Sequence, residues 1–78
     1  MMRETVEMIV KALVDDGAAV DVREIERGGQ TSVIEVRVAQ DDMGKIIGRQ
    51  GRTVRALRSL LHAVGTKGKR RYVLEIVE

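Results

Sequence analysis

Two glycines, Gly48 and Gly51, enclose two polar residues in the middle of a short basic segment of the chain. Because glycine has no Cβ, a Gly-x-x-Gly turn at the start of a helix lets backbone N–H groups approach an anion closely. Lys45, Arg49 and Arg52 place three side-chain cations around the same turn. The spacing therefore predicts that these cations and the amides of residues 49–51 bind phosphate groups.

The charges of the 78-residue chain are divided unevenly, although its net charge is only +2. Residues 1–42 hold ten acidic and five basic side chains, whereas residues 43–74 hold nine basic side chains and no acidic one. A basic half of this kind is typical of a surface that binds a polyanion, and a solvated basic helix face is the alternative. The glycine turn lies within the basic half, which favours polyanion binding. Arg52, Arg55 and Arg58 recur at every third position and should form one basic stripe on a helix.

Apolar residues repeat in patterns that predict the elements before this turn. One apolar helical face over residues 4–16 predicts a first helix, which we expect Gly17 to end. Alternation over residues 20–25 and 34–38 predicts two strands, with a bulge in the first where the period of two breaks. The glycines within residues 27–30 predict a hairpin turn between these strands.

A short helix is predicted at residues 43–47, with Asp41 or Asp42 as its N-cap. A longer helix should follow the glycine turn over residues 52–64 and end at Gly65. After a basic loop at 66–69, the last strand is predicted from alternating apolar residues, namely Tyr72, Leu74 and Ile76.

The predicted element order is α-β-β-α-α-β. The hairpin strands must be antiparallel, and the last strand, which follows a two-helix crossover, should be parallel to the strand before it. We therefore expect a single α+β domain over residues 1–78, with a mixed three-stranded sheet and helices packed on one face. Ile46 and Val54 are expected in the core, and so is Tyr72.

Several kinds of function find no support in the composition. The chain has no cysteine, which leaves no disulfide or thiolate metal site. No Gly-Lys-Ser/Thr follows the glycines, and His62 is the sole histidine, so we expect neither an enzyme nor a cofactor. No segment resembles a signal peptide or a membrane span, which predicts a cytoplasmic protein without membrane contact. With one aromatic residue, the chain cannot build an aromatic base-stacking surface.

The string Ile-Ile-Gly-Arg-Gln-Gly-Arg-Thr-Val-Arg-Ala-Leu-Arg at 46–58 resembles the core of a KH RNA-binding domain, whose glycine turn clamps about four nucleotides. The predicted element order is similar to that of the type II, prokaryotic KH domain. Residues 41–58 resemble most closely the KhpA family of small bacterial proteins with one KH domain.

This resemblance implies binding of single-stranded RNA in a groove floored by aliphatic side chains, namely Ile46, Ile47 and Val54 with strand residues, although core packing is the favoured interpretation for Ile46 and Val54. The residues that it marks for RNA contact are Lys45, Ile47, Gly48, Arg49, Gln50, Gly51, Arg52, Arg55 and Arg58. It also implies a role as an RNA chaperone or post-transcriptional regulator in control of cell length and the cell envelope. The implied protein partner is a KhpB-like KH/R3H protein.

Two alternatives remain open at this point. The first is a dimerisation or interaction subunit of a ribonucleoprotein complex, because the chain is small enough that self-association would help to stabilise it. Single-stranded DNA is the other alternative ligand, because no residue pattern identifies a 2′-hydroxyl contact.

Overall fold

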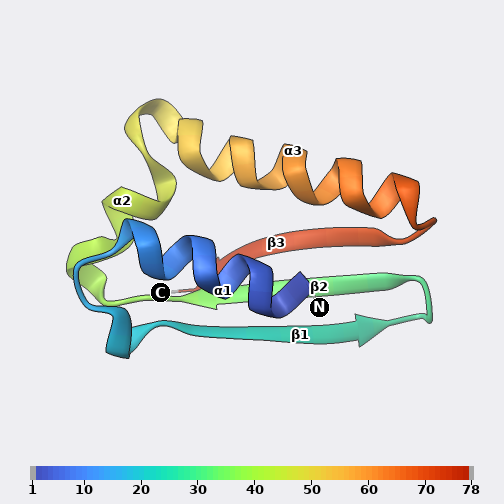
Figure 1. Cartoon of the computed structure of the whole chain (residues 1–78), viewed down its shortest axis with the longest axis horizontal. Coiled ribbons are helices and arrows are strands. Elements are labelled where there is room, and N and C mark those ends of the chain that lie inside the picture. Colours follow the sequence, from blue (N-terminus) through green and yellow to red (C-terminus); the bar gives the residue numbers. More distant parts are fainter. Residues whose placement is uncertain (1, 78) are drawn as a thin grey trace.

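The computed structural model of the chain describes residues 2–77, and its elements follow one another in the predicted order (Figure 1). The helices and strands are α1 (Met2–Leu13), β1 (Asp21–Arg27), β2 (Thr31–Arg37), α2 (Met43–Ile47), α3 (Arg52–Lys67) and β3 (Arg71–Val77). Three 3₁₀ helices lie between them, η1 (Gly17–Ala19), η2 (Gln40–Asp42) and η3 (Arg49–Gly51). The α-β-β-α-α-β order and the α+β class are confirmed.

The strands form one mixed sheet in the order β1-β2-β3. β1 is antiparallel to β2, and β3 is parallel to β2, as predicted. The register places Ile34 of β2 between Glu24 of β1 and Leu74 of β3. Pairing runs one residue to one along all of β1, so the predicted bulge is wrong. β3 is left as an edge strand, and α3 runs along it (Figure 1).

The hydrophobic core lies between the helices and one face of the sheet. Each α-helix and each strand contributes at least one apolar side chain that is less than a tenth exposed. These include Val6 and Val10 of α1, Val22 of β1, Ile34 and Val36 of β2, Ile46 of α2, Val54, Leu57 and Leu61 of α3, and Leu74 of β3. The expectation that Ile46 and Val54 belong to the core is confirmed. Tyr72 is half-buried and packs against this core, also as expected.

α1 ends at Leu13, three residues earlier than predicted. The amide of Val14 still donates to the carbonyl of Val10 at 3.2 Å, but the next two amides leave the helical pattern. The N–H groups of Asp15 and Asp16 donate instead to the side-chain carboxylate of Asp42. A helix cannot continue when the next backbone donors have other acceptors. Gly17 therefore begins η1 and does not end α1.

α3 continues past Gly65 to Lys67, so the prediction that Gly65 ends this helix is wrong. Gly65 is buried, and a Cβ there would overlap the carbonyl oxygen of Arg70 and lie 3.3 Å from Cδ2 of Tyr72. Its carbonyl accepts the amide of Arg70 at 2.7 Å, where the chain turns back toward β3. The glycine is therefore required for close packing of the helix on the returning chain. The basic loop is shorter than predicted and covers only residues 68–70.

No helix within residues 2–77 combines the length and the apolar character that crossing a membrane requires.

Candidate nucleic-acid interface

The Gly-x-x-Gly turn joins α2 to α3 through η3, and left-handed backbone angles reverse the chain there. Gly48, Gln50 and Gly51 have φ values of 76°, 58° and 74°. A Cβ at Gly48 would also lie 2.8 Å from the backbone nitrogen of Thr53, whereas a Cβ at Gly51 would make only an ordinary contact with Cγ1 of Val54 at 4.0 Å. Position 48 thus requires glycine for both space and conformation, and position 51 for conformation alone.

Of the four backbone amides of the turn, two donate hydrogen bonds to other described residues and two do not. The N–H of Gly48 donates to Gly44 at 2.9 Å, and that of Gly51 donates to Gly48 at 3.1 Å. The prediction that the Gly51 amide faces phosphate is therefore wrong, since the turn itself uses that donor. Among the described residues, no backbone hydrogen bond uses the amides of Arg49 and Gln50. These two adjacent donors at the start of α3 are available to an anion.

The side chain of Arg55 helps to hold this turn in place. Its Nη2 donates to the carbonyl oxygen of Gln50 at 2.8 Å, from the first full turn of α3. The hydrogen bond engages one of the five N–H donors of the guanidinium, and its charge stays at the surface. Arg55 therefore both positions the turn and adds to its positive potential.

Exposed cations surround the two free amides. The side chains of Arg49, Arg52 and Arg58 are exposed, and none of them forms an ion pair with another described residue. Arg52 and Arg58 lie on α3 with Arg55 between them, as the predicted stripe requires. The start of α3 therefore carries unneutralised positive charge.

A groove runs beside the turn, between α2, the middle of α3 and the outer side of β3. Its volume is about 630 Å³, and it is lined mainly by apolar side chains, namely Met43, Ile47, Leu74, Ile76 and Val77, with Arg58 and Glu75 as its charged members. Ile47 is 40% exposed, whereas its neighbour Ile46 is fully buried. The structure thus places Ile47 in the groove and Ile46 in the core. An aliphatic floor beside a row of cations suits an extended polyanion with flat apolar groups.

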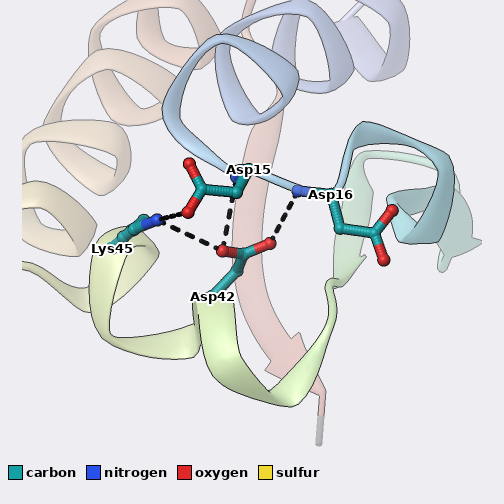
Figure 2. A network of polar contacts seen from close by, with 4 residues as sticks. All are labelled: Asp15, Asp16, Asp42 and Lys45. Atoms are coloured by element: carbon teal, nitrogen blue, oxygen red, sulfur yellow. Dashed lines mark hydrogen bonds and ion pairs between the residues drawn. The ribbon is translucent and has the colours of Figure 1, made fainter.

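Lys45 stands apart from the other predicted contact residues, because acidic side chains hold it (Figure 2). Its Nζ pairs with the carboxylate of Asp15 and lies 3.5 Å from Oδ1 of Asp42. Two carboxylates therefore offset its charge. The sequence pattern gave no sign of this pairing, since residues 15 and 45 lie in different predicted elements.

Asp42 joins the end of α1 to the start of α2. Its carboxylate is almost completely buried and accepts the amides of Asp16 at 3.0 Å and Asp15 at 3.3 Å. Asp42 occupies the N-cap position of α2, as predicted, but its side chain makes no cap hydrogen bond to this helix. Asp15, Asp16, Asp42 and Lys45 together form what we call the Asp42 clamp (Figure 2).

The clamp shifts the pKa values of two of its members. The hydrogen bond from the Asp16 amide, with that of Asp15 and the nearby Lys45 ammonium, holds the pKa of Asp42 below its usual 3.8 against the effect of burial. The hydrogen bond with Asp15 raises the pKa of Lys45 above its usual 10.5. Both shifts favour the charged forms of Asp42 and Lys45 at neutral pH.

An α-β-β-α-α-β fold whose two central helices are joined by a Gly-x-x-Gly turn defines a type II KH domain. The family model described as "KhpA/KhpB, KH domain" matches residues 3–76. The chain therefore belongs to the KhpA/KhpB family of KH domains, as the resemblance of residues 41–58 predicted. This assignment agrees with the expectation that the chain is not an enzyme.

Similar bacterial proteins cover nearly the whole chain. The protein named RNA-binding protein KhpA from Caldanaerobacter subterraneus is 50% identical over 76 residues, which is 97% of this chain and 100% of the relative. The protein of the same name from Aquifex aeolicus is 51% identical, over 99% of this chain and 96% of the relative. The one from Borreliella burgdorferi is 49% identical, over 96% of this chain and 90% of the relative. No solved structure matches the chain significantly.

Proposed function

We propose that the chain binds single-stranded RNA through the Gly-x-x-Gly turn. The observation that carries the proposal is the pair of amides at Arg49 and Gln50, which no described residue accepts. They lie next to exposed arginines that form no ion pair within residues 2–77. The names of the relatives, each an RNA-binding protein, support RNA as the polyanion rather than single-stranded DNA.

In this mode the backbone of the RNA lies across the turn, and its bases lie in the groove. Phosphate oxygens accept hydrogen bonds from the free amides, where the start of α3 adds a favourable dipole. Arg49, Arg52 and Arg58 supply charge along the path of the strand, and Arg55 supplies charge while it holds the turn. Ile47 and the apolar side chains of β3 contact the base faces. Lys45 contributes little, because its charge is already offset.

The broader role that we propose follows from family membership. The chain acts in the cytoplasm as an RNA chaperone or post-transcriptional regulator, together with a KhpB-like partner, in control of cell length and the cell envelope. The match to a family model that covers both KhpA and KhpB supports a relation between the two proteins.

A second candidate function is that of a dimerisation or interaction subunit. Leu60 and Val64 of α3 are 43% and 42% exposed, and they lie one helical turn apart on the same side of the helix. Sedimentation at micromolar concentration tests this candidate, with Leu60→Ser as the variant. A dimer in the wild type that dissociates in Leu60→Ser supports self-association through α3, and a monomeric wild type contradicts it.

The test of RNA binding is the double substitution of Arg49→Asp and Gln50→Asp. Both side chains are exposed, so the change removes no core volume, and aspartate tolerates the left-handed angle at position 50. Acidic residues at a helix N-terminus are favourable by about 0.3–1 kcal/mol, so the melting temperature should hold or rise slightly. For RNA, the same carboxylates stand where phosphates must lie, and we expect binding to be lost.

Binding is measured with an unstructured RNA over a series of salt concentrations. Each phosphate contact on a single strand contributes about −0.7 to the slope of log K against log salt, so three or four contacts give about −2 to −3. Arg23→Asp on β1 is the control, because it reverses a charge at the opposite edge of the sheet. Unchanged binding by a folded double mutant, or a flat salt response of the wild type, would show that the turn is not the RNA clamp.

A further inference from the structure

A second hollow adjoins the groove beside the turn, at the C-terminal end of α3 and the start of β3. This far hollow has a volume of about 660 Å³ and is lined by Arg58, His62 and Thr66 of α3 and by Arg71, Tyr72 and Leu74 of β3. Arg58 and Leu74 also line the groove near the turn, so the two hollows meet at these residues. From Arg58 to Thr66 the helix rises about 12 Å, which is the length that the far hollow adds along α3.

The rim of the far hollow is basic, and none of the described residues that line it is acidic. Arg58 and Arg71 are exposed, and neither forms an ion pair within residues 2–77. Arg70 also lines this hollow, but its guanidinium donates to Oγ of the buried Ser32 at 2.7 Å and to Glu26 at 2.9 Å. Arg70 thus anchors the β1–β2 hairpin, and Arg58 and Arg71 are the cations left for a ligand.

The wall of the far hollow on the β3 side includes Tyr72, which is the only aromatic residue of the chain. Its ring lies close to α3, where the absence of a side chain at Gly65 makes room for it. The ring is half-buried, with one part in the core and another part at the hollow. An aromatic surface between two free arginines suits a nucleotide, which presents a flat base and a phosphate together.

We propose that the far hollow is a second subsite for the same RNA strand, with phosphates on Arg58 and Arg71 and a base against Tyr72. The inference rests on the proposed function of the turn. It extends the contact of the strand beyond the four or so nucleotides that a Gly-x-x-Gly turn clamps. The two lining residues that the hollows share, Arg58 and Leu74, and the matching charge argue for one strand that occupies both hollows.

The first experiment compares unstructured oligonucleotides of about four and eight nucleotides, so that only the longer strand can pass from the turn to the far hollow. Arg71→Gln removes one free cation from the hollow, and Arg23→Gln is the control at the opposite edge of the sheet. For the longer RNA, we expect Arg71→Gln to weaken binding severalfold and to make the salt slope less steep by about 0.7. Binding of the short RNA should not change in either variant.

The second experiment uses the single tyrosine as a reporter. Fluorotyrosine incorporated into the whole chain places one fluorine label, at Tyr72. We expect its NMR signal to shift when the longer RNA is added and to stay in place with the short one. The signal of the free protein should not depend on protein concentration, because a second copy of the chain seated in the hollow would move it without RNA.

The outcomes separate the two proposals. If the Arg49 and Gln50 double mutant loses both RNAs while Arg71→Gln binds the longer RNA like wild type, the far hollow is not a subsite and the turn is still the clamp. An unmoved fluorine signal with the longer RNA, or a signal that shifts with protein concentration alone, would overturn the subsite as well. If the double mutant binds both RNAs normally, it is the proposed function of the turn that fails.

Discussion

The carboxylate of Asp42 accepts the backbone amide of Asp16 at 3.0 Å, across 26 positions of the chain. This hydrogen bond ties the segment after α1 to the residue immediately before α2, and α2 leads directly into the glycine turn. The position of the turn therefore depends on the N-terminal helix, which contributes no residue to the groove or the turn.

Replacing Asp42 with asparagine should destabilise the fold. The side chain is 3% exposed, and an asparagine would retain only one acceptor oxygen for the two amides of Asp15 and Asp16. We expect a lower melting temperature and a lower urea midpoint by circular dichroism. Asp41→Asn is the matched control, because Asp41 is exposed and its substitution should leave both values unchanged. Equal stability of the two variants would contradict the role given to Asp42.

The same variant should show a defined pH dependence. The pKa of Asp42 is lower in the folded protein than its usual 3.8, so the folded state binds the proton less readily than the unfolded state does. The stability that Asp42 contributes is therefore present above pH 3.8 and is lost as the pH falls through the native pKa. Wild type and Asp42→Asn should differ most near neutral pH and converge in acid. Unfolding curves at several pH values check this, and a constant difference would rule it out.

Neutralising Lys45 should leave the salt dependence of RNA binding unchanged. Lys45 is held by Asp15 and Asp42, whereas Arg49 has no acidic partner among the described residues. We therefore expect Lys45→Gln to keep the wild-type slope, and Arg49→Gln to make the slope less steep by about 0.7. Fluorescence anisotropy with a labelled RNA provides the measurement. If the slope of log K against log salt became equally less steep in both variants, Lys45 would be a phosphate contact after all.

Substitution by alanine should change the free energy of unfolding in opposite directions at two glycines that lie within helices. A Cβ at Gly65 meets the carbonyl of Arg70, so Gly65→Ala should destabilise the protein by about 1–3 kcal/mol. A Cβ at Gly44 meets nothing within 4 Å, and Gly44→Ala should stabilise α2 by about 0.5–1 kcal/mol. Urea unfolding measures both. If Gly65→Ala were as stable as wild type, the close packing of α3 on the returning chain would be in doubt.

The two glycines of the turn should differ in how much stability the protein loses when each is replaced by alanine. Gly51→Ala meets only the left-handed φ of 74°, at a cost of about 1–2 kcal/mol. Gly48→Ala meets a comparable angle and also the backbone of Thr53, so its loss of stability should be larger. Thermal unfolding of the two variants gives the order, and a reversed order would argue against the described geometry of the turn.

The sequence alone determined the element order, the sheet and the location of the glycine turn. These follow from local periodicity and from glycine conformation, which depend on neighbours within a few positions. The apolar stripe of Val54, Leu57 and Leu61 needs only its own helix to be recognised. The requirement for glycine at 48 and 51 follows from the turn that joins two predicted helices.

Only the tertiary structure decided how distant polar groups pair. In the sequence, Asp15 and Asp16 are typical of the solvated end of a helix. In the structure their amides donate to the carboxylate of Asp42, because the end of α1 packs against the start of α2. The same packing takes Lys45 out of the predicted set of free cations. In the sequence, Gly65 is typical of a residue that ends a helix. In the structure it lies inside α3, and a side chain there would overlap the carbonyl oxygen of Arg70, where the chain turns back toward β3. Such pairings depend on distances between residues far apart in the chain, and no local pattern encodes those distances.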